Sequence, residues 1–339
     1  MTLNQKIYSL SRPMGGLHLA RFVTKKHPKI LMYHRISERE DCGRITVSQF
    51  EHHLNIIKKH FNPVPLSSLV SQNSKTCVKN NSVAITFDDG YYDFAEYAFP
   101  LLKANNIPAT IFITTGFVNG DLWLWPDQIK YAIDNAARES ISLEVLGGEL
   151  MVAGNELQAW NILSDYCLTA SENEKKSIIR KIFKNLGVDF PNSTPDSYRP
   201  LNWTQINNFI SEGLEVGSHS VTHPILSKLS NNQLVRELQG SRQSIIENTG
   251  VYPKGFCFPN GMPDDFNERV KLAVKAAGYE YAVTAYPGPN PMGDRFAINR
   301  YPAQNDIESF EKSIYGLTML AMKCQIVSDQ IITRRGTNE

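Results

Sequence analysis

The feature that most constrains the fold is the run from Ser82 to Gly90, SVAITFDDG. Its apolar, β-prone part, Val83–Phe87, predicts a strand covered on both faces, because such strands need not alternate polar and apolar residues. The strand ends in two adjacent acids, Asp88 and Asp89, which are costly to bury unless water, a cation or hydrogen bonds hold them. Taken alone, the segment fits a solvated Asp-Asp-Gly turn as well as it fits a functional strand end.

Strand-like and helical segments alternate along most of the 339 residues, a length sufficient for one large α/β domain. The expected strands are 29–33, 82–87, 109–113, 214–217, 255–259, 281–285 and 296–300. The expected helices include 50–61, capped by Ser48, 203–211, capped by Thr204, then 231–248, 265–277 and 307–324. Strands separated by helices are typical of a (β/α) barrel with one unit missing, or of a doubly wound sheet.

Residues 120–200 interrupt this alternation with two amphipathic segments, 157–168 and 172–186, and a proline-rich polar stretch. About 80 residues of this polarity make only a small core, so we expect a mostly helical insertion rather than an independent domain. The predicted organisation is a lead-in at 1–28 with one helix near 17–23, a main domain at 29–305, and a C-terminal helix and tail at 306–339.

The composition excludes several classes of protein. Lys and Arg number 35 against 34 Asp and Glu, which argues against extensive disorder and against a nucleic-acid partner. Five scattered cysteines without a C-x-x-C pair fit reduced thiols (Cys42, Cys77, Cys167, Cys257, Cys324). Basic residues interrupt the N-terminal segment, and no stretch approaches the ~20 apolar residues of a membrane span. We therefore expect a cytoplasmic protein and leave open a peripheral contact with the inner face of a membrane.

Chemically versatile side chains lie at or just past the ends of five of the predicted strands. In a parallel barrel these strand ends share one rim, where loops build the active site. Five coincidences at one rim are hard to attribute to solvated turns. The residues are His34, Asp88 with Asp89, His219 with His223, Asn260 with Gly261, and Arg300.

The two histidines of the segment HSVTH, His219 and His223, are spaced i, i+4, so a helical turn would present their imidazoles together. With a carboxylate from another strand they complete a three-ligand set, which leaves one metal position open for water. The alternative is a pair of surface or capping histidines beside Pro224. The nearby acids favour the metal site.

Only one acid of the pair is expected to bind the metal, since the other can then serve as a base toward water acidified by the cation. His34 is a candidate general acid, because the ordinary pKa of histidine lies near neutrality. Oxyanion donors are expected from the backbone at Pro259–Gly261; proline has no N–H, so the donor is Asn260 or Gly261.

Three motifs in this order resemble the polysaccharide deacetylase family (NodB homology, carbohydrate esterase 4). They are TFDDG at 86–90, GSHSVTHPIL at 217–226 and FPNG at 258–261, and the resemblance covers roughly 29–302. It implies a distorted (β/α)7 barrel of the NodB type, a divalent metal, usually Zn²⁺ with Co²⁺ or Ni²⁺ as alternatives, and hydrolysis of an N-acetyl group on an amino sugar. Carried over by motif, Asp88 is the base, the backbone N–H of Asn260 serves the oxyanion hole, and the metal ligands are Asp89, His219 and His223.

Two departures from the family pattern concern the supports of this site. Many members begin the third motif with an arginine that tethers the base, but Cys257 stands there, and Arg300 is the expected substitute. Many members also take the acid histidine from a late Leu-x-His motif, which is absent here. The early YHR at 33–35 resembles the branch of poly-N-acetylglucosamine deacetylases, in which the acid histidine precedes the TFDDG strand; His34 fits that position.

The expected function is therefore removal of an N-acetyl group from an oligomeric, lipid-linked or nucleotide-linked sugar. The insertion, with Trp123, Trp125, Asp127 and Trp203 beside it, is a candidate wall of a sugar subsite, although tryptophan serves more often in core packing. The alternative function is a catalytically silent relative that binds glycan in a surface-polysaccharide assembly system. The complete set of two acids and two histidines argues against that alternative.

Overall fold

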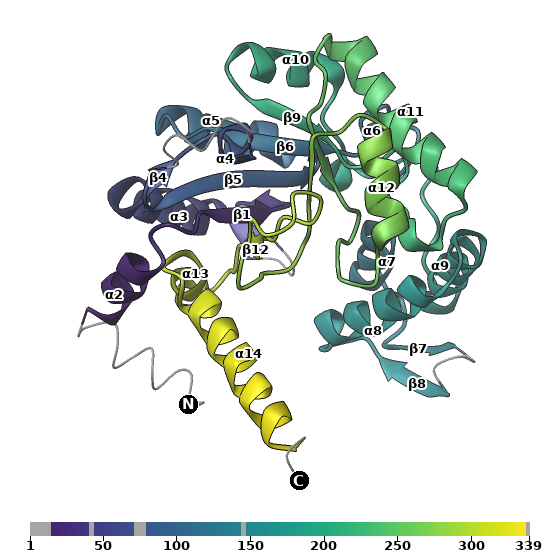
Figure 1. Cartoon of the computed structure of the whole chain (residues 1–339). Coiled ribbons are helices and arrows are strands. Elements are labelled where there is room, and N and C mark those ends of the chain that lie inside the picture. The colour runs from purple at the N-terminus through teal and green to yellow at the C-terminus, as the bar shows by residue number, and fades with distance from the viewer. Residues whose placement is uncertain (1–14, 41–43, 71–78, 144–146, 337–339) are drawn as a thin grey trace.

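The computed structural model describes residues 15–40, 44–70, 79–143 and 147–336. Its centre is an eight-stranded sheet in the order β11-β10-β9-β6-β5-β1-β12, with β4 also paired to β5 (Figure 1). All pairs in this sheet are parallel, so the carboxyl ends of the strands meet at one rim. The strands are β1 (Lys29–Tyr33), β4 (Asn62–Pro63), β5 (Ser82–Asp89), β6 (Ala109–Ile113), β9 (Glu215–Ser218), β10 (Gly255–Cys257), β11 (Tyr281–Val283) and β12 (Tyr301–Pro302).

Strand β5 is the central strand that its sequence predicts. Every residue of it is buried, and it pairs along its length with β1 and β6, whose predicted bounds are confirmed. The strand is two residues longer than expected, because Asp88 and Asp89 stay in register with Phe112 and Ile113. The two acids therefore belong to the sheet and are not part of a solvated turn.

The predicted strand at 296–300 is wrong. Only Ile298 forms an isolated parallel bridge, to Val283, and pairing with β1 begins at Tyr301. The ladder is interrupted because the N–H groups of Asn299 and Arg300 donate to loop carbonyls, those of Pro291 and Tyr286. The segment nevertheless crosses from β11 to β1 and links the two edges, which gives the distorted seven-stranded barrel path that the sequence predicts.

Helices surround the sheet at the predicted places (Figure 1), but two predicted caps are wrong. The first long helix is capped by Thr46 rather than Ser48, and α10 is capped by Asn202 rather than Thr204. In both helices the capping side chain and a glutamine three residues later exchange hydrogen bonds with each other's backbone, so two free N–H groups are satisfied together. The helices are α3 (Val47–His60), the π-helical η1 (Phe94–Ala98) with α5 (Phe99–Ala104), α6 (Thr115–Val118), α10 (Trp203–Ser211), α11 (Asn231–Thr249) and α12 (Glu268–Ala276).

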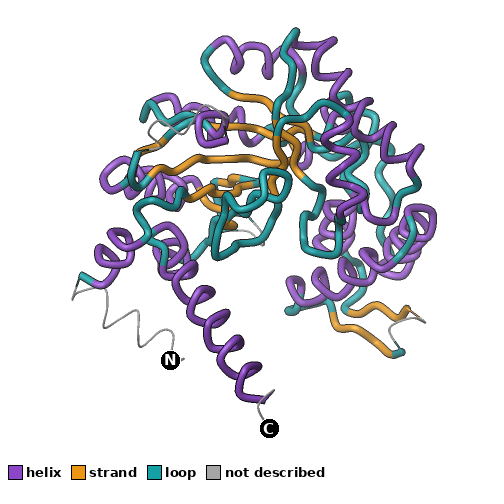
Figure 2. Tube along the Cα trace, viewed as in Figure 1, coloured by secondary structure: helices purple, strands orange, loops and turns teal. Residues whose placement is uncertain are grey.

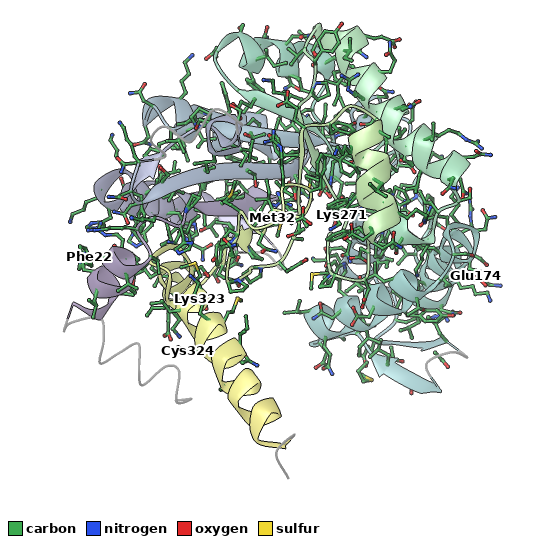
Figure 3. All side chains as sticks on the ribbon, viewed as in Figure 1. Phe22, Met32, Glu174, Lys271, Lys323 and Cys324 are labelled. Atoms are coloured by element: carbon green, nitrogen blue, oxygen red, sulfur yellow. The ribbon has the colours of Figure 1, made fainter. Side chains whose placement is uncertain are left out.

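The first and the last described helices lie together on one side of the barrel, where α2 (Gly16–Val23) contacts α14 (Leu317–Gly336). The single helix predicted at 307–324 is two, α13 (Ile307–Ile314) and α14, separated at Gly316. Gly316 has φ +92°, and a side chain there would collide with Thr24, so the helix cannot continue through it. Figure 3 shows Phe22 on the outer side of α2 and Lys323 and Cys324 on α14.

Four short elements complete the barrel: α4 (Leu66–Val70), η4 (Leu226–Lys228) and the bridge of β2 (Ile36–Ser37) with β3 (Ile45–Thr46). Cys167, Cys257 and Cys324 are free thiols, as expected, while Cys42 and Cys77 lie outside the described residues, as do residues 1–14 of the lead-in. None of the helices within the described ranges combines the length and the hydropathy that a membrane span requires.

The insertion has its own hydrophobic core and lies beside the rim of the barrel. The two amphipathic segments are confirmed as α8 (Glu156–Thr169) and α9 (Glu172–Leu186), which pack with α7 (Trp125–Asp134). The sequence did not predict the antiparallel hairpin of β7 (Ser140–Leu143) and β8 (Gly148–Met151), drawn apart from the main sheet in Figure 2. The short η3 (Asp196–Tyr198) leads back to the barrel. Buried residues of this core include Ile129, Ile133, Leu163, Ile179, Ile182, Phe183 and Leu186.

Candidate active site

The carboxyl end of β5 places its two acids in different surroundings. Both are buried, with 2% of Asp88 and 6% of Asp89 exposed. Asp89 has φ +73°, in the left-handed region that is unfavourable for a residue with a side chain. Its carbonyl accepts from the Thr114 N–H at 3.0 Å at the end of β6, which helps to hold this conformation. Such strain at a strand end is common in functional sites, where surrounding structure compensates for it.

Asp88 is clamped by Arg300, a fully buried side chain. The guanidinium Nη1 and Nη2 donate to the two carboxylate oxygens at 2.8 and 2.7 Å. Arg300 also donates from Nη1 to the Thr86 hydroxyl at 3.0 Å and from Nε to the Thr284 carbonyl at 2.6 Å. Burial alone would raise the pKa of Asp88, but the charge and hydrogen bonds of Arg300 overcome this effect and hold that pKa well below its ordinary value. The expected partnership of Arg300 with Asp88 is present.

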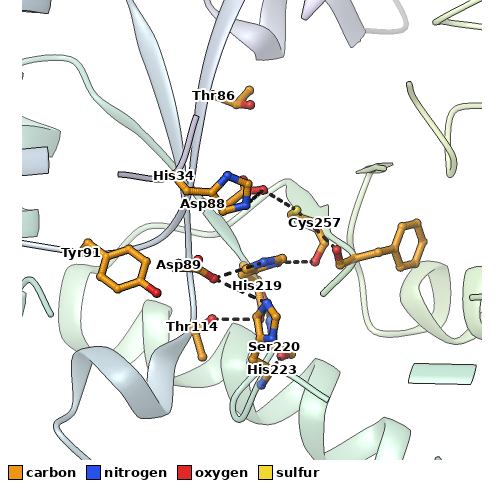
Figure 4. Close-up of polar contacts among 12 residues, drawn as sticks. His34, Thr86, Asp88, Asp89, Tyr91, Thr114, His219, Ser220, His223 and Cys257 are labelled. Atoms are coloured by element: carbon orange, nitrogen blue, oxygen red, sulfur yellow. Dashed lines mark hydrogen bonds and ion pairs between the residues drawn. The ribbon is translucent and has the colours of Figure 1, made fainter. Parts of the chain in front are cut away.

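His219 and His223 come together through a loop and not through the helical turn expected from their spacing. Ser220 and His223 have φ of +68° and +58°, and the His223 N–H donates to the Ser220 hydroxyl at 3.0 Å. Glu237 on α11 accepts from the N–H groups of the two residues between them, Val221 and Thr222, at 2.8 and 2.9 Å. The loop is thus held by α11 in a conformation that directs both imidazoles toward Asp89 (Figure 4).

The three predicted metal ligands form a compact donor set. Nε2 of His219 and Nε2 of His223 each lie 3.5 Å from Oδ1 of Asp89, and the ligand atoms all fall within 4.8 Å of one another (Figure 4). Oδ1 of Asp89 is buried without a hydrogen-bond partner within the described part of the chain. A buried carboxylate oxygen without a donor is unfavourable, and a cation between the three side chains would relieve it. These residues therefore fit a divalent metal.

The protonation of these groups suits metal binding. Burial lowers the pKa of His219 to about 4 and that of His223 well below its ordinary value, so both imidazoles are neutral at pH 7. The Nδ1 atom of His219 lies 2.8 Å from the Cys257 carbonyl, which leaves Nε2 with its lone pair toward Asp89. Burial, and then the charge of Asp88, raise the pKa of Asp89, the effect that a bound cation would reverse.

Cys257 lies beside the clamped acid. Its Sγ is 3.5 Å from Oδ2 of Asp88 and 3.0 Å from Nη2 of Arg300. The Cys257 thiol forms a second group of three possible ligands with Asp88 and His219, whose ligand atoms all lie within 4.8 Å of one another. However, Asp88 is already engaged by Arg300, and burial raises the pKa of the Cys257 thiol far above its ordinary value, which disfavours the thiolate that a metal requires. The first donor set is the better metal site.

His34 and Asn260 flank the carboxylates. Nε2 of His34 is 3.8 Å from Oδ2 of Asp88, and 43% of its side chain is exposed. Burial lowers the pKa of His34, and the Asp88 carboxylate partly opposes this effect. Asn260 has φ +58°, and its side chain donates to Asp265 at 2.6 Å, which holds the turn. The neighbouring Gly261 N–H already donates to the Pro259 carbonyl at 2.6 Å, so of the two expected oxyanion donors only that of Asn260 remains for a ligand.

Six of the seven predicted site residues line one cavity of about 390 Å³, and the seventh, Arg300, is buried behind Asp88. This volume is within the usual range of about 300–1,000 Å³ for small-molecule sites. The predicted subsite residues Trp123, Trp125 and Trp203 are not among its lining residues; Trp123 packs in the insertion core, and Trp203 donates to Asn119 at 2.9 Å. Asp127 does line it. Sequence reasoning missed the wall residues Arg35, Arg44, Tyr91, Leu124, Pro126, Lys130, Leu157, Trp160 and Tyr198.

A buried polar cluster joins the insertion to the strand ends. Nε of Arg35 donates to Asp93 at 2.9 Å, Nη1 lies 3.9 Å from Asp127, and the guanidinium lies 4.3 Å from the centre of the Tyr91 ring. The Tyr91 hydroxyl donates to Asp127 at 2.7 Å, and burial raises the pKa of Asp127 to about 6. Arg35 follows the predicted site residue His34 within the YHR motif, and Tyr91 directly follows the TFDDG motif; these positions in the sequence were the signal that could have pointed to them.

Solved structures share the fold of this chain. The Streptococcus pyogenes deacetylase PplD in complex with acetate aligns over 84% of this chain and 96% of its own, with a TM-score of 0.56 and 15% identity. IcaB from Ammonifex degensii aligns over 86% of this chain and 97% of its own, with a TM-score of 0.56 and 15% identity. At this identity the likeness establishes the fold, a barrel of the NodB type.

The polysaccharide deacetylase family model matches residues 75–140 and 167–282, more than half of the chain. The chain belongs to the polysaccharide deacetylase family. Among curated proteins, YxkH of Bacillus subtilis is 34% identical over 119 residues, which are 34% of this chain and 40% of YxkH. YlxY of the same organism is 34% identical over 65 residues, 18% of this chain and 20% of YlxY. The chain thus spans two fifths or less of the curated relatives that it matches.

Proposed function

We propose that this chain is a metal-dependent hydrolase that removes the N-acetyl group from an amino sugar and releases acetate. The observation that carries the proposal is the unequal pair of acids at the end of β5. Asp88 is held ionised by Arg300, while Asp89 faces two neutral imidazoles with one oxygen unsatisfied. Family membership supports an N-deacetylase, and residues 29–305 form the proposed catalytic domain.

We propose that Asp89, His219 and His223 hold the ion and that it is Zn²⁺, since one carboxylate and two imidazoles with an open position are a usual catalytic zinc set. Co²⁺ and Ni²⁺ accept similar ligands and are the alternatives. Such an ion would supply Lewis acidity, acidifying a coordinated water and polarising the acetamide carbonyl.

Asp88 is the proposed general base. Its low pKa keeps the carboxylate ionised at neutral pH, and the fork of Arg300 fixes its orientation, so it can accept the proton of the attacking water. The Asn260 N–H would donate to the carbonyl oxygen as negative charge develops there. The water oxygen bonds to the carbonyl carbon, the C–N bond breaks, and acetate leaves.

His34 is the proposed general acid for the departing nitrogen. It lines the same cavity, and its exposed side chain lies 3.8 Å from Asp88, near enough for the two groups to act on one small acetamide. By donating a proton, the imidazolium would release the leaving nitrogen as a free amine. The N-acetyl sugar and one water thus give acetate and the amino sugar. The carrier of the sugar, whether oligomeric, lipid-linked or nucleotide-linked, is part of the test below.

Acetate release tests the proposal directly. The metal-free protein, reloaded with Zn²⁺, Co²⁺ or Ni²⁺, is assayed against chitooligosaccharides, UDP-N-acetylglucosamine and lipid-linked N-acetyl sugars. We expect metal-dependent release from at least one class. We expect Asp88→Asn to lose turnover with one metal still bound per chain, and Asp89→Ala to lose the metal as measured by elemental analysis.

Two results would contradict parts of this assignment. Loss of metal in Asp88→Asn would exchange the roles of the two acids. Glycan binding without acetate release across the whole panel, with metal bound, would instead support the catalytically silent relative.

A further inference from the structure

We propose that the insertion forms a second sugar subsite next to the reacting one, with the Trp160 ring as the platform for the neighbouring pyranose. The proposal deepens the proposed function and rests on it, because it names the substrate as an amino-sugar chain of at least two rings. It follows from a cavity whose two sides come from different parts of the chain.

The cavity has a polar side and a largely apolar side. The barrel supplies the acids and imidazoles, whereas α7, α8 and the loop before α7 supply Leu124, Pro126, Leu157 and Trp160. Leu157 and Trp160 are spaced i, i+3 on α8 and therefore share one helix face. Leu157 is 54% exposed, although the insertion has a core in which an apolar side chain could be buried. An apolar face left open toward a catalytic site is typical of a ligand-binding wall.

Trp160 is fixed in a way that suits stacking. Its Nε1–H donates to the Pro126 carbonyl at 3.1 Å, so the polar group of the indole is satisfied and the ring orientation is set. The ring is only partly buried and packs against the insertion core while lining the cavity. Sugars present C–H groups on the faces of the pyranose ring, and flat aromatic surfaces with a satisfied polar edge bind such faces well.

The platform is held in place relative to the acids. Asp127 on α7 accepts from Tyr91 at 2.7 Å and lies 3.9 Å from Arg35, both near the strand ends. At the C-terminal end of α8, the Leu168 carbonyl accepts from Lys228 of η4. A wall fixed at both ends loses little freedom when a ligand binds, which favours affinity.

The polar groups of the same wall favour a sugar over a lipid chain or a nucleobase. Lys130, Asp127 and Tyr198 line the cavity among the apolar side chains. Lys130 is paired with Asp134 and Asp127 accepts from Tyr91, but an ammonium group and a carboxylate can each form further hydrogen bonds. A hydrocarbon chain would displace water from them without replacing those bonds, whereas sugar hydroxyls both donate and accept. The observations therefore favour a pyranose with its hydroxyls at the polar groups and one face on Trp160.

The test compares Trp160→Ala and Trp160→Phe with Trp203→Phe, a control tryptophan that donates to Asn119 and does not line the cavity. Acetate release is measured on N-acetylated chitooligosaccharides of one to five sugars. We expect Trp160→Ala to raise KM about 3- to 10-fold for two or more sugars, with kcat nearly unchanged and no effect on the monosaccharide. Trp160→Phe should retain most of the affinity, and Trp203→Phe should behave as wild type.

A second readout does not depend on activity. Chitotriose is titrated into wild type and into Asp88→Asn while intrinsic tryptophan fluorescence is followed. We expect a saturable change that is lost in Trp160→Phe and kept in Trp203→Phe.

A KM effect that is equal for all chain lengths, or absent, overturns the subsite. A Trp160-dependent fluorescence change without acetate release from any substrate supports the subsite and contradicts the proposed function. No binding of any chitooligosaccharide contradicts the subsite, while acetate release from another sugar would leave the proposed function standing.

Discussion

Replacing Arg300 by methionine should both destabilise the fold and raise the pKa of Asp88. Arg300 is fully buried and donates to both oxygens of Asp88, to Thr86 and to Thr284. Removing one partner of a buried ion pair costs about 3–5 kcal/mol, because the other charge remains in a medium of low polarity. Leaving the Thr284 carbonyl without its donor adds roughly 1 kcal/mol. The free energy of unfolding should therefore fall by about 4–6 kcal/mol at pH 7.

The pH dependence follows from the direction of the Asp88 shift. In the wild type the folded pKa of Asp88 lies below the unfolded value of about 3.9. The stabilisation is thus fully present above that value and is lost as the pH falls through the folded pKa. In Arg300→Met, burial would place the folded pKa above about 3.9, so the difference between the two proteins should be largest near neutrality and shrink toward pH 3.

The same change should appear in the kinetics. If the ionised Asp88 carboxylate loses about 3 kcal/mol of stabilisation, its pKa rises by roughly two units. The acid limb of the kcat/KM profile should therefore move to higher pH by at least that much. Denaturant unfolding from pH 3 to 8 and the pH–rate profile are the two measurements. An unchanged unfolding free energy at pH 7, or an acid limb that stays in place, would refute the reasoning.

Two further variants control for simple misfolding. Arg300→Lys retains a positive charge but cannot form the two-pronged contact, so its effects should be intermediate. Adding Cys257→Arg to Arg300→Met places a guanidinium beside Asp88 again, since the Cys257 Sγ lies 3.5 Å from Oδ2. Part of the lost stability and the original acid limb should then return.

Four more outcomes are expected. His34→Gln should lower kcat by about 10²- to 10⁴-fold, as expected for loss of a general acid, with metal content unchanged by elemental analysis. Gly217→Ala should lower stability by about 1–3 kcal/mol in denaturant titrations, because its Cβ would collide with the Phe112 ring. Burial lowers the pKa of Lys29 to about 8, so between pH 8 and 10 only the unfolded chain still holds that proton. The free energy of unfolding of the wild type should therefore rise over this range by up to about 1.4 kcal/mol per pH unit. Lys29→Met should lack this rise. Chelation of the metal should lower Tm. Adding back Zn²⁺ at 100 times its Kd should raise the free energy of unfolding by about 2.7 kcal/mol, as measured in denaturant titrations.

The sequence by itself determined the strand that carries the acids and the identity of the residues at the rim. The bounds of β1 and β6 and the two main helices of the insertion followed from periodicity and local composition. These signals are local, because backbone hydrogen bonding and burial of one face depend on residues a few positions apart. Parallel strands then required that side chains after different strands meet at one rim, which placed Asp89 near His219 and His223 without knowledge of any long-range contact.

Only the tertiary structure decided how these groups are supported. The clamp on Asp88 comes from Arg300, 212 residues away, in a segment that its sequence suggested was a strand. The imidazoles meet through a strained loop held by Glu237. The tryptophan that lines the cavity is Trp160, while the three that the sequence suggested lie outside its lining. The physical reason is common to all of these cases. Which side chain fills a given space, or satisfies a given buried charge, depends on the packing of distant segments, and no local pattern records it.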